Sequence, residues 1–408
     1  MKAEILITGI SQLVTAEGAG PKRGPAMREL RIIERAAFAI TAGVVVWVGK
    51  ESQWKGEAET IFDAGGRAVV PGLIDPHTHV VWAGDRFADF EARTSGSTYE
   101  EILAAGGGIR STIRATAAAS QNDLVALANP RIDSLIASGA TTIEIKSGYG
   151  FTPEAELRML EAIQSLSQIS PARISSTLLI HVPPAIPAER SNYMTRICEE
   201  LIPEVAKRKL ATAVDIFVEK EAWQVAEAKV LFDHAKKYGL AIKLHSDQFH
   251  CIGGLELGIL YHALSVDHLE ASGPEQIAKI AASSTIATIL PGVSLHLGIP
   301  SAPGRKLIDA GAAVAIGTDL NPGSSPLFSI SEALALSVRL NGLTSQEALV
   351  AGTVNASSAL GMKTGGRLEE GCNADFLVLK DSDWRDLVYA LGRNPTHQVW
   401  IGGKRVEG

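Results

Sequence analysis

Between residues 68 and 320 the chain alternates short apolar runs with longer segments that have helical character. The apolar runs, which we interpret as strands, lie at residues 68–79, 141–148, 174–181, 213–219, 241–247, 263–269, 285–291 and 313–320. Helical segments between them include 122–139, 153–166 and 221–239. Nearly continuous apolar strands that alternate with helices are typical of a parallel sheet covered on both faces. Eight such strands in about 250 residues predict an α/β fold, a closed (β/α)8 barrel of the TIM type.

An open, doubly wound sheet is the alternative arrangement of the same elements. Such a sheet would favour a Gly-x-Gly-x-x-Gly loop after its first strand, and the sequence has none there. The Gly-rich segment at 106–110 follows a helical segment rather than a strand. We therefore interpret this segment as a flexible connection and keep the barrel as the predicted arrangement.

Both ends of the chain are rich in strand-forming residues. Near the start, strands are expected at residues 5–10, 27–40 and 43–50; near the end they are expected at 374–380 and 397–406, where Gly-Gly-Lys is a plausible hairpin turn. This pattern predicts a small β-sandwich domain assembled from residues 1–65 and 365–408. The barrel would then span residues 66–364.

Composition limits the partners that such a protein can have. With 38 Lys and Arg against 45 Asp and Glu, the formal net charge is −7, and no basic face is evident, so we expect no nucleic acid partner. Apolar stretches are much shorter than the roughly 20 residues that a membrane-spanning helix needs, so we expect no membrane association. Three Cys without a Cys-x-x-Cys pair, and a start without a secretory signal, favour a cytoplasmic protein.

Polar side chains that can bind metals stand at the ends of five predicted strands. They are His77, His79, His181, His245, His268 and Asp319. Active sites of (β/α)8 barrels form at the carboxyl ends of the strands. Core packing does not explain this many such residues at matching positions, so we predict a functional cluster.

The spacing of His77 and His79 predicts that both imidazoles face the same space, because residues i and i+2 of a strand share a face. Neutral imidazoles suit transition metals. With His245 and Asp319 they would form a three-histidine, one-aspartate site with room for a water molecule, whose pKa a bound ion would lower towards about 7. Asp319 could contact the ion and also accept the proton of the water. His268 would stabilise the developing oxyanion or carry protons, or else orient a metal ligand.

Longer motifs resemble the metal-dependent amidohydrolase superfamily. They are PGLIDPHTH at 71–79, the His of the fifth strand, Asp-His in the sixth, Thr-Asp in the eighth, and GRLEEGCNADFLVL near the C-terminus. More narrowly, HTHVVWAGDR at 77–86, EIKSGYG at 144–150, KLHSDQF at 243–249, DHLE at 267–270 and TDLNPGSSP at 318–326 look like the imidazolonepropionase family. That resemblance implies hydrolysis of the cyclic amide of 4-imidazolone-5-propanoate to N-formimino-L-glutamate in histidine degradation.

The resemblance also implies residue roles. It makes His77, His79, His245 and Asp319 the ligands of one Zn²⁺ or Fe³⁺ per chain and assigns catalysis to His268 and Asp319. It assigns substrate or product contacts to Arg86, Tyr149, His181, Gln248, Asn321, Gly323 and Ser324, with Tyr99 as a weaker candidate. A homodimer is compatible with it.

Several of these assignments have a physical reason of their own. The planar guanidinium of Arg86 could bind the propionate carboxylate with two hydrogen bonds. Gln248 can both donate to and accept from the edge of a cyclic amide. Glu219 or Lys220, at the end of the fourth strand, could bridge a second metal ion, although the resemblance favours one. The segments after the third and seventh strands, at Val182 and at 292–298, depart from the family pattern and flank the expected pocket.

Two other functions compete with this interpretation. A deaminase or another cyclic amidohydrolase could use the same barrel, but such deaminases place a proton-carrying Glu near the His of the fifth strand, where this chain has Gln248. A barrel that serves only as an assembly scaffold would not need three histidines and an aspartate at its strand ends. We therefore expect an enzyme that acts on a small molecule.

Overall fold

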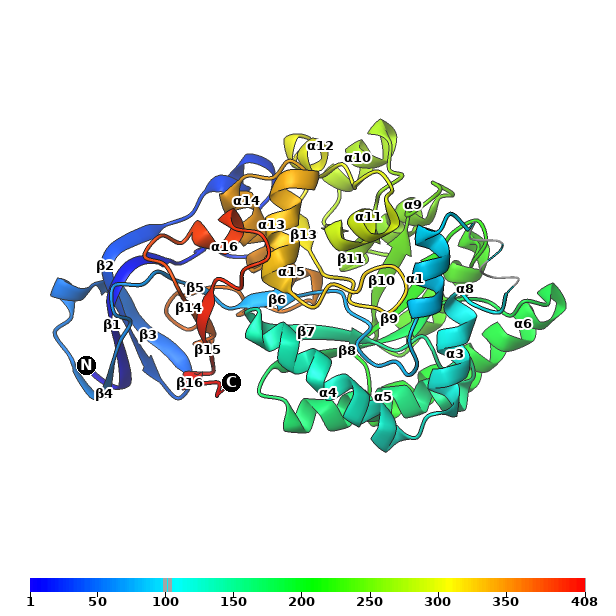
Figure 1. Cartoon of the computed structure of the whole chain (residues 1–408), viewed down its shortest axis with the longest axis horizontal. Helices are drawn as coiled ribbons and strands as arrows, with labels where there is room; N and C mark the ends of the chain where they lie inside the picture. Colours follow the sequence, from blue (N-terminus) through cyan, green and yellow to red (C-terminus); the bar gives the residue numbers. More distant parts are fainter. Residues whose placement is uncertain (98–100, 102–104, 408) are drawn as a thin grey trace.

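The computed structural model describes residues 1–97, 101 and 105–407. The chain forms a barrel surrounded by helices and, beside it, a smaller sheet that contains both termini (Figure 1). Within the described part of the chain, no helix is long and apolar enough to cross a membrane.

The barrel has eight strands. They are β6 (Leu73–Asp75), β7 (Ala140–Lys146), β8 (Arg173–Ile180), β9 (Ala213–Val218), β10 (Ala241–Ser246), β11 (Ser265–His268), β12 (Ile286–Ile289) and β13 (Val314–Ile316). Each strand pairs in parallel with the next strand along the chain. All eight predicted barrel strands are therefore confirmed in order, although only residues 73–75 of the first predicted run, at 68–79, form a strand of the barrel.

The segments beyond β6 and β13 close the barrel. Thr78 and Leu320 form a parallel bridge, the amide of His79 donates to the carbonyl of Leu320 at 2.9 Å, and the amide of Asp319 donates to the carbonyl of His77 at 2.9 Å. The same hydrogen bonds hold two expected metal ligands next to each other. The predicted closed barrel is confirmed, and the open sheet is excluded.

Helices surround the barrel strands. Between β6 and β7 lie α1 (Phe87–Thr94), α3 (Ile109–Ala118) and α4 (Gln121–Ala137). The helices that follow are α5 (Pro153–Ile169), α6 (Pro187–Arg196), α7 (Ile202–Arg208), α8 (Val225–Lys237), α9 (Gly254–Leu260), α10 (Pro274–Ala281), α11 (Pro291–Leu297), α12 (Gly304–Asp309), α13 (Ile330–Leu340), α14 (Ser345–Ala351), α15 (Val354–Ala359) and α16 (Asp386–Tyr389). A π-helical turn (Ile197–Leu201) joins α6 to α7.

Capping residues and apolar stripes explain the predicted helices. Ser120 caps α4 by accepting from the amide of Asp123, and Thr152 caps α5 by accepting from the amide of Ala155. α4 buries Leu124, Ala128, Ile132 and Leu135, which share one face at three- and four-residue spacing. α8 begins later than the predicted residue 221, because Trp223 forms a bridge with Val218 and keeps the intervening residues in a turn.

The smaller sheet joins both ends of the chain. Its strands are β1 (Lys2–Val14), β2 (Ile32–Thr41), β3 (Val44–Lys50), β4 (Glu57–Asp63), β5 (Val69–Pro71), β14 (Phe376–Leu379), β15 (Thr396–Ile401) and β16 (Lys404–Arg405). β1 pairs with β2 along one edge and with both β4 and β5 along the other. The prediction of a small β-domain built from both termini is confirmed, but its strands form one continuous sheet instead of the predicted sandwich of two sheets.

A shared aromatic core holds the two ends of this domain together. Phe38 from β2 packs edge to face on Phe376 from β14, with ring centroids 5.0 Å apart. Trp400 from β15 stacks on Phe376 at 5.2 Å and contacts Phe62 from β4 at 5.0 Å. Trp400 pairs with Arg405 across the predicted Gly-Gly-Lys hairpin turn, which is confirmed by the antiparallel pairing of β15 with β16.

Two predicted strands differ from the structure. The expected strand at 27–40 begins only at Ile32, because a 3₁₀ turn (Gly24–Arg28) with Pro25 precedes it. The expected strand at 68–79 is divided at Gly72 into β5, in the smaller sheet, and β6, in the barrel. The domain boundary at 65/66 stays a prediction, although β5 lies beyond it and pairs with terminal strands.

Candidate metal centre

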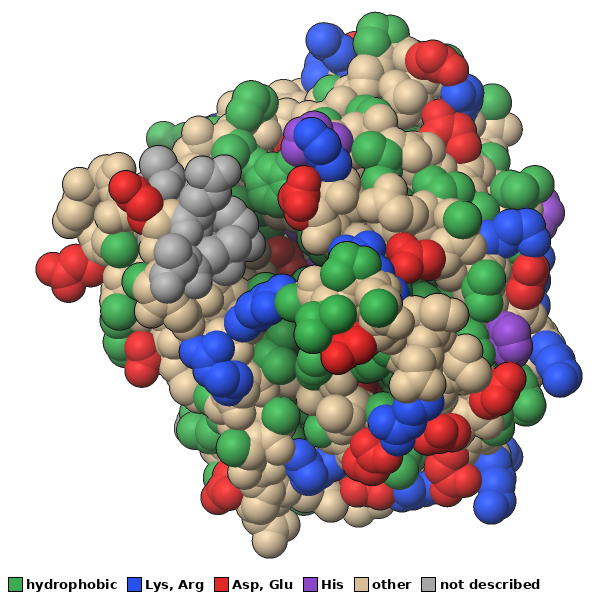
Figure 2. Space-filling view, turned by 90° about the vertical axis from the view of Figure 1, so that its right-hand side faces the viewer, with side chains coloured by type: hydrophobic (Ala, Val, Ile, Leu, Met, Phe, Trp, Pro, Cys, Tyr) green, Lys and Arg blue, Asp and Glu red, His purple; other side chains and the backbone are tan. Residues whose placement is uncertain are grey.

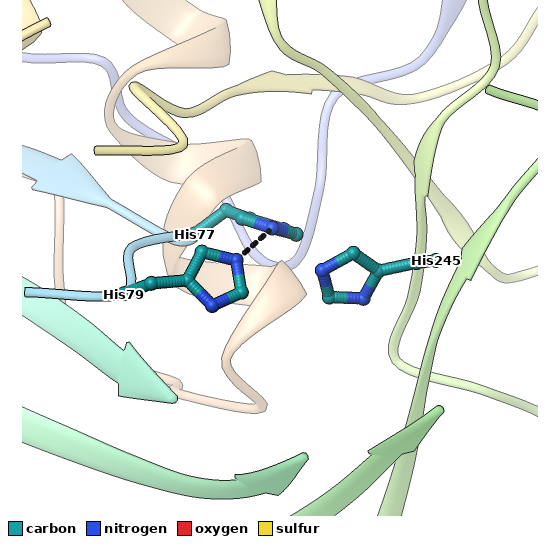
Figure 3. Close-up of side chains that lie close together, drawn as sticks. All are labelled: His77, His79 and His245. Carbon is teal, nitrogen blue, oxygen red and sulfur yellow. Dashed lines mark hydrogen bonds between the residues drawn. The ribbon is translucent and has the colours of Figure 1, made fainter. Parts of the chain in front are cut away.

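The predicted strand-end residues gather at the carboxyl ends of the barrel strands. The ring of His77 lies 5.2 Å from that of His79 and 4.5 Å from that of His245, between centroids. His268 adds a fourth ring, 5.4 Å from His245. His77 and His79 follow β6, and Thr78 between them forms a parallel bridge with Leu320. Both imidazoles converge with His245, as their spacing predicted (Figure 3).

The candidate metal centre consists of His77, His79, His245 and Asp319. One nitrogen from each histidine lies within 4.8 Å of the others. Asp319 Oδ1 lies 3.1 Å from His79 Nε2 and 3.3 Å from His77 Nε2. His245 Nε2 and Asp319 Oδ1 are buried and have no hydrogen-bond partner among the described residues. Imidazole nitrogens and a carboxylate oxygen that converge in one buried space fit a transition-metal ion.

The outer nitrogens of two histidines are held by buried carboxylates. His77 Nδ1 lies 2.6 Å from Asp267 Oδ2, and His245 Nδ1 lies 2.9 Å from Asp215 Oδ1. When Nδ1 donates to a carboxylate, the lone pair of Nε2 is left facing inwards, as metal ligation requires. Burial lowers the pKa of His245 to about 3, so this ring is a neutral acceptor at pH 7.

The acidic side chains around the candidate metal centre stabilise positive charge on the groups beside them. Burial and Lys146 disfavour the charged ring of His77, but Asp267 and Asp319 outweigh them and raise its pKa to about 9. Burial alone would raise the pKa of Asp319, but the adjacent imidazoles of His77 and His79 hold it well below its usual value. Asp319 is therefore ionised, and a cation at the meeting point of these groups would be stabilised.

Two lysines neutralise the carboxylates beneath the histidines. Lys146 Nζ lies 2.7 Å from Asp215 Oδ2 and 3.0 Å from Glu144 Oε2, and Lys243 Nζ lies 3.1 Å from Glu144 Oε2. All of these side chains are fully or almost fully buried. Burial alone would raise the pKa of Asp267, but Lys243 and His77 hold it well below its usual value. This network fixes the charge state of the carboxylates that orient the histidines.

These supporting residues were not predicted, although the sequence carries a signal for them. Glu144 and Lys146 lie two residues apart in β7, and Lys243 lies two residues before His245 in β10. Charged residues within an otherwise apolar strand must be paired when the strand is buried. Alternation along the strand then places them on the inner face, beneath the histidines.

Asp319 is oriented by the turn that follows it. Its backbone has a φ of +52°, in the left-handed region, and Asn321 Nδ2 donates to its Oδ2 at 3.0 Å. Asn321 Oδ1 in turn accepts from the amides of Gly323 and Ser324, both at 2.8 Å. The amide group of Asn321 is thus engaged within the turn, and Oδ1 of Asp319 is left to face the histidines.

His181 and Tyr149 stand beside the candidate metal centre. His181 stacks on His79 with centroids 5.5 Å apart, and Tyr149 lies 5.5 Å from His181 and 6.0 Å from His79. Burial lowers the pKa of His181 well below its usual value and raises that of Tyr149. Both side chains are therefore neutral at pH 7.

The predicted carboxylate-binding residue lies across from the turn. Arg86 pairs with Asp89 and lies 3.5 Å from Thr112 Oγ1. A Cβ on Gly323 would lie 3.1 Å from the Arg86 guanidinium, so the side chain passes close to this turn. Ser324 Oγ lies 3.5 Å from Asp319 Oδ2. Tyr99 lies outside the described residues.

Figure 2 looks onto the face to which the barrel strands point. A hollow opens there beside the grey atoms, with Lys and Arg side chains on its rim. The remaining predicted residues lie on the segments that lead to this face: Gln248 on the loop after β10, and His268 at the end of β11. His268 Nδ1 lies 3.4 Å from Glu270 Oε2.

Comparison with known proteins shows the family to which the chain belongs. The model of the Amidohydrolase family matches residues 68–406. Imidazolonepropionase of Deinococcus deserti is 60% identical over 403 residues, which cover 99% of this chain and 100% of that protein. Imidazolonepropionase of Bacillus velezensis is 36% identical, with coverage of 99% and 97%.

Solved structures show the same fold at low identity. A 5-methylcytosine deaminase from Klebsiella pneumoniae superposes with a TM-score of 0.75 at 18% identity and covers 98% of each chain. An adenosine deaminase from Xanthomonas campestris superposes with a TM-score of 0.73 at 17% identity, covering 99% of this chain and 93% of that one. At such identities the likeness establishes the architecture alone.

Proposed function

The chain belongs to the amidohydrolase family and, within it, to the imidazolonepropionases; from this premise we propose that it hydrolyses the ring amide of 4-imidazolone-5-propanoate to N-formimino-L-glutamate. Near-complete alignment with relatives at 59–60% identity supports the substrate. The convergence of three imidazole nitrogens with Asp319 Oδ1 at the barrel mouth carries the chemistry, because it forms a site for a metal ion and a water molecule.

His77, His79, His245 and Asp319 are proposed to hold one Zn²⁺ or Fe³⁺ per chain. A nitrogen and oxygen ligand set suits either ion. When bound, the ion would lower the pKa of a coordinated water from 15.7 towards about 7 and so supply a nucleophile at neutral pH. The carboxylates Asp215 and Asp267 orient the ligating rings, as carboxylates behind metal-binding histidines commonly do.

Asp319 and His268 are proposed to move the protons of the reaction. A proton released by the attacking water passes to the Asp319 carboxylate, which is ionised and buried beside His77 and His79. His268 lies beside His77 and His245, so its imidazole can donate to the oxyanion that forms on the ring carbonyl. The proton on Asp319 is then available to the departing ring nitrogen.

Four side chains around the candidate metal centre are proposed to hold the substrate. Arg86 binds the propionate carboxylate, and Gln248 pairs with the N–H and C=O edge of the ring. His181 and Tyr149, neutral at pH 7, line the wall beside His79 and contact the ring. Asn321, Gly323 and Ser324 contribute through the turn that orients Asp319 and approaches Arg86.

The test is a direct assay of the purified protein with 4-imidazolone-5-propanoate, alongside cyclic ureas, adenosine, guanine and cytosine. We expect release of N-formimino-L-glutamate, and loss of that release after metal removal with a chelator. Elemental analysis should give about one metal ion per chain. Turnover of a deaminase substrate in preference to the imidazolone would assign the barrel to the alternative function.

Composition supports the remaining predictions on setting and assembly. The net charge of −7 without a basic face supports a small-molecule enzyme with no nucleic acid or membrane partner, located in the cytoplasm. A homodimer stays a prediction, which sedimentation analysis of the purified protein would test.

A further inference from the structure

The loop after β10 carries Gln248 and is anchored by a buried carboxylate from the neighbouring strand. Glu219 directly follows β9, and its side chain is only 5% exposed. Glu219 Oε2 accepts from the backbone amides of Phe249 at 2.9 Å and of His250 at 3.0 Å. Its Oε1 lies 2.8 Å from His250 Nδ1. One side chain therefore holds two consecutive residues of this loop.

These bonds also account for the burial of Glu219. A buried carboxylate is costly unless donors surround it, and bonds from amides to a carboxylate are among the stronger hydrogen bonds in proteins. Oε1 accepts a further bond, from the amide of Lys220 at 2.8 Å, so both oxygens are engaged with donors. Glu219 is thus used as an anchor and does not join the converging ligand atoms, which come from His77, His79 and His245.

A second buried carboxylate holds the other side of Gln248. Asp247 accepts from Ser272 Oγ at 2.9 Å and from Ser246 Oγ at 2.8 Å, and its backbone has a φ of +57°. Ser272 lies beyond His268, on the segment after β11. The loop is therefore fixed towards β9 on one side and towards β11 on the other.

Gln248 lies between the segments held by Glu219 and by Asp247, and its own side chain is available for a ligand. The side chain of Gln248 makes no hydrogen bond to another described residue, although the residue is only 8% exposed. A glutamine that must present both its N–H and its C=O to one ring edge needs a defined backbone, because a shift of about 1 Å breaks both bonds. The hydrogen bonds from the amides of Phe249 and His250 to Glu219 fix the backbone next to Gln248.

We propose that Glu219 is a positioning residue, which fixes the 247–250 loop so that Gln248 meets the ring amide of the substrate. The inference rests on the proposed function, since it assigns Glu219 to the substrate side of that same site. It places Glu219 in substrate recognition and removes it from metal bridging.

The first test is Glu219→Gln, which sets an NH₂ group against backbone donors while it keeps the size of the side chain. We expect the KM for 4-imidazolone-5-propanoate to rise about tenfold, the loss expected for about one charged hydrogen bond, with a smaller change in kcat. Metal content should stay at the wild-type value. Glu221→Gln, at an exposed neighbouring position, is the matched control and should leave KM unchanged.

A local measurement separates anchoring from substrate recognition. Hydrogen exchange at the amides of Phe249 and His250 should speed up by about tenfold in Glu219→Gln and not in Glu221→Gln. Faster exchange with an unchanged KM would overturn the proposal, because the anchor would then not serve substrate binding. A fall in metal content would also overturn it, because Glu219 would then act at the metal.

A double variant shows whether Glu219 acts through Gln248. In a Gln248→Ala background, Glu219→Gln should raise KM no further, since non-additivity reports two residues that work together. If Glu219→Gln raises KM in the Gln248→Ala background by the same factor as in the wild type, Glu219 does not act through Gln248 and the proposal is refuted. Wild-type turnover is measured first: if another ring amide is hydrolysed instead, the proposed function fails, and the same variants are compared on that compound.

Discussion

Asp319 shows how one residue combines several constraints. A positive φ in a residue other than glycine costs free energy and is kept where the surroundings hold it. Here the hydrogen bond from the backbone amide of Asp319 to the carbonyl of His77 and the hydrogen bond from the side chain of Asn321 both hold this conformation. The result is a carboxylate with one oxygen aimed at two histidines and the other hydrogen-bonded to the turn.

Asp319→Ala should therefore remove both metal affinity and turnover. We expect kcat to fall by about three orders of magnitude or more, because a group that works with the other ligands is lost. Elemental analysis and a steady-state assay check this. Asp133→Ala, at an exposed position of α4, is the control. Wild-type metal content together with wild-type turnover in Asp319→Ala would contradict the double role.

Arg86→Ala tests the carboxylate contact. The KM for 4-imidazolone-5-propanoate should rise by about one to two orders of magnitude, since a lost charged hydrogen bond is worth about 1.5–3 kcal/mol. Arg110→Ala, at an exposed position of α3, should leave KM unchanged. An imidazolone without the propionate group should be insensitive to Arg86→Ala; equal losses for both compounds would place Arg86 outside substrate binding.

At this scale the sequence predicted the residues at strand ends better than those beneath them. His77, His79, His245 and Asp319 could be found because the carboxyl ends of barrel strands meet at one mouth. Asp215 lies in the middle of an apolar strand, which indicates that it is paired but not with which residue, because its partner, Lys146, is distant in the sequence. Contacts between distant charges require the pairing register of the strands, which the sequence alone does not provide.

At the scale of elements, β7 and β10 each carry ionised side chains into the barrel interior. Alternation along a strand places Lys146 of β7 and Lys243 of β10 on the inner face, and both contact Glu144. Their partners lie across the barrel, since Lys146 of β7 pairs with Asp215 of β9 and Lys243 of β10 pairs with Glu144 of β7. Ion pairs therefore join strands that are not adjacent in the barrel sheet.

Lys146→Met removes a charge from this network. Breaking a buried ion pair leaves the partner charges uncompensated, at a cost of about 3–5 kcal/mol. The free energy of unfolding, measured by urea denaturation, should fall by that order, and metal affinity should weaken because Asp215 loses its partner. Lys207→Met, on the exposed face of α7, should change neither quantity appreciably. Unchanged stability in Lys146→Met would mean that the carboxylates rearrange at little cost.

The element boundaries were predicted less well than the elements themselves. α8 begins at Val225 because Trp223 pairs with Val218, and β2 begins at Ile32 because a 3₁₀ turn precedes it. Such short-range pairings compete with propensity over a few residues and are decided by tertiary contacts. The order of strands along the barrel was predictable, because each strand pairs with the next.

At the scale of the molecule, the small β-domain depends on aromatic contacts between the two ends of the chain. Phe38 and Phe62 come from the N-terminal part, and Phe376 and Trp400 from the C-terminal part. These rings belong to the smaller sheet, whereas the candidate metal centre lies at the carboxyl ends of the barrel strands. Stability and catalysis should therefore respond separately to changes here.

Trp400→Ala tests this separation. Truncating a large, mostly buried aromatic side chain costs about 3–5 kcal/mol, so the midpoint of unfolding should fall clearly. At a temperature where the variant stays folded, kcat and KM should remain at wild-type values. Trp54→Ala, at a half-buried position that contacts Trp47, should lower the midpoint less. A loss of kcat in folded Trp400→Ala would show that the β-domain shapes the site.

Gly72 marks the point where the two parts of the molecule are joined. β5 ends at Pro71 in one sheet and β6 begins at Leu73 in the other, and a Cβ on Gly72 would lie 2.4 Å from Thr141 Oγ1. Replacing the small β-domain by that of another barrel protein would require a junction at this glycine, a short distance upstream of His77. Such a junction could shift the register of β6, so the β-domain and the barrel are best transferred together.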